Sequence, residues 1–166
     1  MRTWVILPLL CAVLPAADPL MQPVTVCEIV KDPVAYEGKV VPLVGRFSFR
    51  SSGRFVSEEA CEEGPAAAAR AGVLPIAEDG KSAPQVPLIL KIDAKAVAQK
   101  LEHIRRTTSL RKFRFGSPDY DRWALVYGQV ERRDPPPPAA APESGAAPPV
   151  RLLIRGDGAI IFLSEN

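Results

Sequence analysis

A continuous block near the N-terminus, TVCEIVKDPVAYEGKVVPLVGRF (residues 25–47), constrains the fold most. Its first residues, Thr25 to Glu28, have the T-x-x-E form of a capping box, so we expect a short helix from Val26. Asp32 and Pro33 interrupt that helix, because the residue before a proline disfavours helical backbone angles. The chain then turns through residues 36–39 into a long apolar, β-rich run.

Strand patterns follow this block along most of the chain. We expect strands at residues 40–49 and 54–57, joined by a hairpin turn at 51–53, and further strands at 86–92 and 123–131. The last segment, residues 150–163, predicts one or two strands around a tight turn at 155–158. Gly45 and Gly128 lie inside two of these strands, where a glycine is typical of a bend or bulge.

One longer helix is expected between the third and fourth strands. Asp93 can cap it, and Val97, Leu101 and Ile104 fall on one face at helical spacing. The order of elements therefore predicts a mainly β fold with supporting helices, namely a five-stranded OB-like (oligonucleotide/oligosaccharide-binding-like) barrel. It has a short N-terminal helix, and the helix between strands three and four plugs one end of the sheet.

Two stretches of the sequence do not fit this barrel and predict flexible insertions. Residues 62–84 are rich in alanine, glycine, proline and charge, with one helical turn expected at 66–71. Residues 134–149 are rich in proline and alanine and read as a loop or spacer.

The motif C-E-I-V-K-D-P-x-A-Y-E-G-K-x-V-x-L-x-G, with V-Y-G-Q-V-E later in the chain, resembles secreted OB-like domains of bacterial proteins of unknown function. The resemblance covers residues 24–49, Cys61 and residues 124–131. It implies a secreted barrel, and its glycines specify turns rather than chemistry.

Residues 1–17 have the layout of a signal peptide: Arg2, a short apolar run from Trp4 to Leu14, and small residues before Asp18. The run is shorter than the ~20 residues of a membrane-spanning helix, and an uncleaved N-terminal anchor is the alternative. Residues 18–166 then form a single domain, secreted or periplasmic, with no membrane span. Of the 21 basic and 19 acidic residues only Arg2 is removed, so the mature net charge is +1 and does not by itself favour polyanions.

Two cysteines, Cys27 and Cys61, remain after removal of the signal. In an exported protein such a pair predicts one disulfide, with two buried free thiols as the alternative. The spacing excludes a C-x-x-C redox motif.

The basic and aromatic residues between 105 and 123 form the main charge cluster and the candidate ligand surface. Alternatively, its Phe residues and Trp123 anchor the connection between the longer helix and the following strand in the core, while the basic residues form a solvated rim. A second, weaker surface surrounds the first hairpin. The first set comprises Arg105, Arg106, Arg111, Lys112, Phe113, Arg114 and Phe115; the second comprises Arg46, Phe47, Phe49, Arg50, Arg54 and Phe55.

The sequence offers little support for a catalytic site or a metal site. His103 is the sole histidine, and we expect it on an exposed helix position. The acidic residues around Cys61 lack the spacing of a calcium loop and predict a solvated loop; these are Glu58, Glu59, Glu62 and Glu63. No phosphate-binding loop or serine-nucleophile motif is present, so we expect no catalytic residues, metal or cofactor.

The sequence therefore predicts an exported, non-enzymatic binding or interaction module with an unknown protein or envelope partner. The alternative is binding of single-stranded nucleic acid or another polyanion through residues 105–123. A small hydrolase is a third class, but it would need an acid–base pair that the sequence does not offer.

Overall fold

The computed structural model describes residues 20–59, 61, 72–110, 119–133 and 149–164. The predicted signal peptide, the predicted helical turn at 66–71, and residues 62–71 and 134–148 of the two predicted insertions lie outside these residues. So do Arg111, Lys112, Phe113, Arg114 and Phe115 of the candidate ligand surface.

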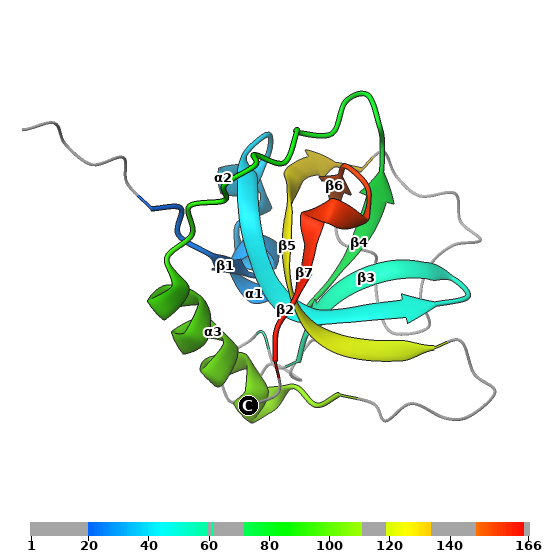
Figure 1. Cartoon of the computed structure of the whole chain (residues 1–166). Helices are drawn as coiled ribbons and strands as arrows, with labels where there is room; N and C mark the ends of the chain where they lie inside the picture. Colours follow the sequence, from blue (N-terminus) through cyan, green and yellow to red (C-terminus); the bar gives the residue numbers. More distant parts are fainter. Residues whose placement is uncertain (1–19, 60, 62–71, 111–118, 134–148, 165–166) are drawn as a thin grey trace, which may run out of the picture.

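Five strands close into a barrel, which confirms the predicted mainly β, five-stranded architecture (Figure 1). Going round the barrel, the first strand in the chain pairs with the second, the second with the third, the third with the fifth, the fifth with the fourth, and the fourth with the first. All these pairs are antiparallel except the third with the fifth, which is parallel. In chain order the strands are β2 (Val40–Arg50), β3 (Gly53–Glu58), β4 (Gly72–Glu78), β5 (Tyr120–Arg132) and β6 (Val150–Ile154).

A seventh strand extends the sheet beyond this ring. β7 (Ile160–Phe162) pairs with the same edge of β5 as β6 does, and also runs antiparallel to it. Between β6 and β7 the chain leaves β5 through a turn that includes the 3-10 segment Asp157–Ala159, and Gly156 there has a positive φ of 62°. The predicted turn between two C-terminal strands is therefore confirmed.

The N-terminal elements form as predicted. β1 (Val24–Thr25) leads into α1 (Val26–Lys31), where Thr25 and Glu28 make both hydrogen bonds of a capping box. The helix stops before Asp32, and α2 (Pro33–Tyr36) starts afresh with the proline in its first turn, where the missing N–H leaves no bond unmade.

The third barrel strand is not where the sequence predicted it. β4 lies inside the stretch interpreted as an insertion, whereas residues 86–92 form no strand and make one isolated bridge, between Ile92 and Met21. Leu88 is fully exposed. Residues 72–78 form the third barrel strand instead, because they pair with both β3 and β6 and because Leu74 lies in the core. Their glycine and proline content concealed the strand pattern.

The longer helix, α3 (Ala94–Thr107), begins at the predicted cap, where the Asp93 carboxylate accepts the N–H of Ala96. Its apolar stripe packs on the outside of the barrel rather than plugging an end. Leu101 and Ile104 contact a second core cluster that also contains Val44, Trp123 and Leu125.

The element that closes one end of the barrel is α1, since Val26 and Ile29 are fully buried in the main core. The prediction that the helix between the third and fourth strands forms the plug is therefore wrong. Alternating side chains explain the outcome: Val44 and Trp123 point away from the barrel interior and leave an apolar strip that α3 covers.

The two strand glycines serve close packing rather than bulges. The β2–β5 register runs without interruption through Gly45 opposite Ala124 and Gly128 opposite Val41. A Cβ at Gly45 would lie 2.5 Å from a methyl carbon of Val56, and one at Gly128 would lie 2.7 Å from the carbonyl oxygen of Leu153. Of the predicted bend or bulge, the bulge is therefore wrong. Glycine is required at both positions because neighbouring strands approach too closely for a side chain there.

Candidate functional site

The described part of the predicted ligand surface is engaged in contacts within the domain. Arg105 donates to the carbonyl oxygen of Ser164 at 2.7 Å, and its guanidinium carbon lies 5.8 Å from the centre of the Trp123 ring. Arg106 forms an exposed salt bridge with Glu102, one turn earlier on α3. Arg105 therefore helps to hold α3 and the C-terminal residues on the outer face of β5, whereas the Arg106 pair lies within α3.

Strand alternation divides the hairpin surface between the two faces of the sheet. Phe47 lies in the main core, so Phe49 on the same strand also faces the barrel interior, while Arg46 and Arg50 face outward. Arg46 pairs with Glu59 at 2.7 Å, and Arg50 pairs with the buried Asp121. The outward arginines are thus fixed by carboxylates.

The inward side chains continue across β2 and β5 to form what we call the aromatic–arginine face: Phe49, Tyr120, Arg122 and Phe162. Phe49 lies opposite Tyr120 in the β2–β5 register, with stacked rings 5.5 Å apart and 9° from parallel. The buried Phe47 lies beneath them and meets the Phe162 ring edge-on at 5.8 Å. Offset and edge-to-face contacts of this kind favour aromatic pairs, so the face is built on a rigid aromatic base.

Arg122 lies over two rings of this face. Its guanidinium carbon is 5.2 Å from the centre of the Phe162 ring and 6.0 Å from that of Tyr120. The Arg122 side chain is exposed. Among the described residues it contacts these two rings and forms no salt bridge. An arginine held by cation–π contacts keeps its N–H donors available to a ligand.

A charged rim adjoins the face on β3. Arg54 is the neighbour of Phe49 in the β2–β3 register, as Tyr120 is on the other side. Its guanidinium lies 2.8 Å from an oxygen of Asp157 and 3.6 Å from one of Glu78. The Asp157 side chain is 84% exposed, so its carboxylate has remaining capacity to accept hydrogen bonds from a ligand.

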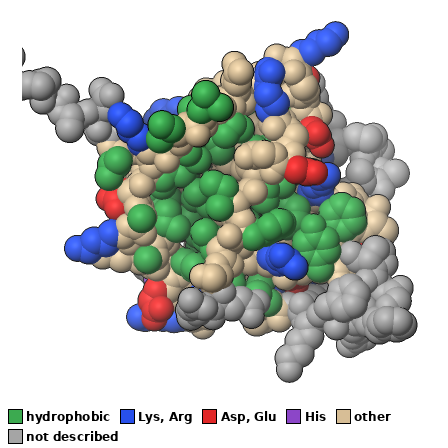
Figure 2. Space-filling view, viewed as in Figure 1, with side chains coloured by type: hydrophobic (Ala, Val, Ile, Leu, Met, Phe, Trp, Pro, Cys, Tyr) green, Lys and Arg blue, Asp and Glu red, His purple; other side chains and the backbone are tan. Residues whose placement is uncertain are grey.

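Figure 2 shows hydrophobic side chains gathered across the middle of the molecule on the side drawn in Figure 1, with charged side chains around them. Phe162 of the aromatic–arginine face is 46% exposed. Exposed apolar surface rimmed by polar groups is typical of interaction sites.

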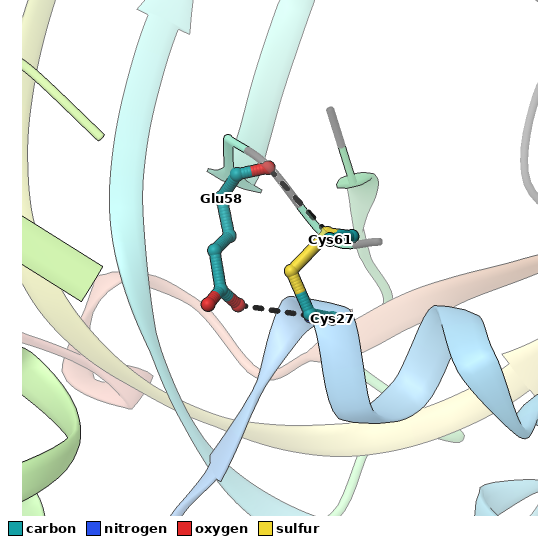
Figure 3. A group of neighbouring side chains, drawn as sticks. All are labelled: Cys27, Glu58 and Cys61. Atoms are coloured by element: carbon teal, nitrogen blue, oxygen red, sulfur yellow. Dashed lines mark hydrogen bonds between the residues drawn. A yellow bond between two sulfur atoms is a disulfide. The ribbon is translucent and has the colours of Figure 1, made fainter. Parts of the chain in front are cut away.

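The opposite end of β3 is closed by a covalent and polar clasp (Figure 3). Cys27, in the first turn of α1, forms the predicted disulfide with Cys61. The buried Glu58 carboxylate, at the end of β3, accepts the backbone N–H of Cys27 at 2.9 Å. Both links hold α1 against the point where β3 ends.

Cys27, Glu58 and Cys61 also form a group with metal-ligating atom types within 4.8 Å of one another. Sulfurs joined in a disulfide carry no thiolate, which is the form that binds a metal. The trio is therefore a structural clasp while the disulfide is formed.

Two predictions about polar residues have different outcomes. His103 is exposed on α3, as expected. The acidic run was expected to be a solvated loop, which is wrong for Glu58, whereas Glu59 follows β3 outside the strand with its side chain 39% exposed. Glu58 belongs to β3 and bonds α1, and Glu59 pairs with Arg46; Glu62 and Glu63 lie outside the described residues.

Sequence reasoning missed Arg122 and Phe162 as site residues. The signal that could have found Arg122 is its place at alternate spacing between Tyr120 and Ala124, on the strand face opposite Trp123. Phe162 carries no such signal, because its approach to Phe47 depends on β7 pairing with β5.

No protein-family model, curated protein or solved structure matches this chain. Among the residues described, no helix has both the length and the apolar character needed to cross a membrane.

Proposed function

We propose that this protein is an exported, non-catalytic binding module built on an OB-type barrel, and that the aromatic–arginine face is its ligand surface. The strand order supports the OB assignment, because a five-stranded barrel with a helix between its third and fourth strands is the plan of that fold. The outer position of α3 and the plugging role of α1 are departures from the simplest version of the plan.

The observation that carries the proposal is the exposure of Arg122 and Phe162 on a rigid aromatic base. Tyr and Phe rings supply contact area with little loss of conformational entropy, and a guanidinium supplies directed donors. A phenylalanine ring has no exchangeable proton, and a guanidinium only donates hydrogen bonds. The chemistry of this face is therefore suited to binding rather than to acid–base catalysis.

The proposed compartment rests on the signal-like residues 1–17 and the Cys27–Cys61 disulfide. Disulfides form and persist in oxidising compartments such as the periplasm and the cell exterior. In a bacterial expression host, the intact mass of the periplasmic protein is expected to lack the first 17 residues or so. Recovery of the full-length mass from the membrane fraction would favour an N-terminal anchor instead.

Single-stranded nucleic acid is the second candidate ligand, because Tyr120 and Arg122 lie within the basic and aromatic region 105–123. Base stacking on aromatic side chains and phosphate contacts to arginine would use the same face. Affinity for nucleic acid would fall steeply as salt increases.

The binding-module proposal is tested by mapping ligand-induced shifts of backbone amide NMR signals in the oxidised protein. A panel of acidic and neutral oligosaccharides, a single-stranded oligothymidine and a set of extended peptides would serve as probes. We expect at least one probe to shift amides of β2, β5 and β7 near the face. Shifts confined to the outer surface of α3, or turnover of a probe, would contradict the proposal.

A further inference from the structure

The chemistry of the aromatic–arginine face and its rim narrows the class of ligand. The face offers an apolar, exposed ring at Phe162, an exposed guanidinium at Arg122, and on the rim the paired groups Arg54, Glu78 and Asp157. Each of these would bind a different kind of chemical group in the ligand.

The rim carboxylates would bind a ligand that has hydrogen-bond donors. An ionised carboxylate only accepts hydrogen bonds, whereas a hydroxyl can both donate and accept. Glu78 and Asp157 are each more than half exposed, at 54% and 84%, so they can receive donors from outside the protein. A negatively charged ligand group placed at the rim, whether phosphate or carboxylate, would be repelled by Glu78 and Asp157, so the rim favours hydroxyl groups of the ligand.

Arg122 would bind one negatively charged, planar hydrogen-bond acceptor of the ligand. Its fork of N–H groups fits both oxygens of a carboxylate, and such charge-assisted pairs are stronger than neutral hydrogen bonds. Arg54 is already neutralised by Glu78 and Asp157, so within the described residues Arg122 is the cation of this face that carries no salt bridge.

Phe162 would pack against a flat group of the ligand that has an apolar surface. A sugar ring presents C–H bonds on one face and hydroxyls around its edge, so it can lie on a Phe ring while its hydroxyls reach a polar rim. Phe49 is flanked in register by Arg54 on one side and by Tyr120 on the other, so rings and rim lie on the same side of the sheet.

From these requirements we infer that the ligand is an oligosaccharide containing a carboxylate-bearing sugar. Its carboxylate pairs with Arg122, its ring lies on Phe162, and its hydroxyls donate to Asp157 and Glu78. This inference rests on the proposed function, because it takes the aromatic–arginine face to be the binding surface.

The experiment is isothermal titration of the oxidised full chain with three probes: a trimer of galacturonic acid, the methyl ester of the same trimer, and a single-stranded oligothymidine. Binding of the acidic trimer is expected to exceed binding of the ester by roughly tenfold or more, the usual weight of a hydrogen bond to a charged group. R122A should remove this preference, and R122K should restore part of it as a point charge without the fork.

Matched controls separate the face from the rest of the surface. R106A removes one exposed arginine from α3 and should leave the affinity unchanged. F162A should weaken binding, while I161A should not, because the two residues are almost equally exposed but lie on opposite faces of β7.

The outcomes distinguish the ligand class from the proposed function. Equal affinity for the acid and its ester, or tighter binding of oligothymidine that still depends on Arg122 and Phe162, would overturn the acidic-sugar inference and leave the binding face standing. Binding of every probe that is unaffected by both R122A and F162A would overturn the proposed function as well.

Discussion

Two regions of the barrel differ in how far they are covered. At what we call the closed end, beside Glu58 on β3, the apolar side chains are covered by α1 and fixed by the Cys27–Cys61 disulfide. At the aromatic–arginine face, which we call the open end, Phe162 remains in contact with solvent. The closed end buries Val26 and Ile29 completely. The open end leaves Phe162 nearly half exposed beside Arg122, which forms no salt bridge among the described residues. The two regions therefore differ in how completely their apolar side chains are buried.

The closed end should therefore carry stability, and removing its plug should have the largest effect. Ile29→Ala removes a fully buried side chain and should lower the free energy of unfolding by about 2–5 kcal/mol. The matched control is Val34→Ala on α2, where the side chain is 72% exposed and the change should stay within about 0.5 kcal/mol. Urea unfolding measures both, and equal losses would show that α1 is not a plug.

Removing the disulfide tests the covalent part of the clasp. The two cysteines are separated by 34 residues, and a loop of that length predicts a loss of about 2–4 kcal/mol in the C27S/C61S double variant. Unfolding of the oxidised wild type and the variant gives the value. If the variant matched wild type under oxidising conditions, the closed end would owe its stability to packing and to Glu58 alone.

Close packing beside α1 gives a smaller expected effect. Gly45→Ala places a Cβ 2.5 Å from a methyl carbon of the buried Val56 and 3.4 Å from one of Val26. We expect a loss of about 1–3 kcal/mol, because the core must shift to admit the methyl group. A combined G45A/V56A variant, which supplies the missing space, should show a smaller loss than the sum of its parts. Strict additivity would argue against the contact as the cause.

The open end should tolerate substitutions that the closed end does not. Arg122→Ala removes two exposed cation–π contacts and, among the described residues, no salt bridge, so its effect on the free energy of unfolding should be at most about 1 kcal/mol. Thermal or urea unfolding checks this. A loss as large as that of Ile29→Ala would mean that Arg122 is part of the fold rather than of a binding face.

The smallest expected effect concerns acid sensitivity of α3, on the outer wall. The backbone hydrogen bond from Ala96 holds the pKa of Asp93 below its usual range, with a further contribution from Gln22. A carboxyl whose pKa is lower in the folded state stabilises the protein above its unfolded pKa and loses that contribution as pH falls through the folded value. Stability measured at pH 6 and pH 3 should therefore fall less in Asp93→Asn, which keeps a capping oxygen but does not titrate. Identical pH dependence would remove Asp93 as a cause.

Local signals predicted the elements whose structure depends on neighbouring residues. The capping box at Thr25, the proline at 33 and the Asp93 cap each act within a few residues, and all three appear in the structure. The cysteine pair was also predictable, because Cys11 lies in the predicted signal peptide and the prediction therefore left Cys27 and Cys61 as each other's partners.

Non-local packing explains what sequence reasoning could not supply. Residues 86–92 have the more β-like composition, yet residues 72–78 form the third strand because both β3 and β6 need a partner there. The apolar stripe of α3 was read correctly, but its partner is the strip around Val44 and Trp123 on the outer wall. The aromatic–arginine face was missed for the same reason, since Phe162 reaches Phe47 only after β7 has paired with β5.

The division of roles between the two ends is tested most directly by titrating the galacturonic acid trimer into two folded variants, Ile29→Val and Phe162→Ala. Ile29→Val should lose about 0.5–1.5 kcal/mol of stability and keep wild-type affinity. Phe162→Ala should remain nearly as stable as wild type and bind at least several-fold more weakly. Equal affinity in the two variants, or a loss of affinity in Ile29→Val alone, would contradict the account.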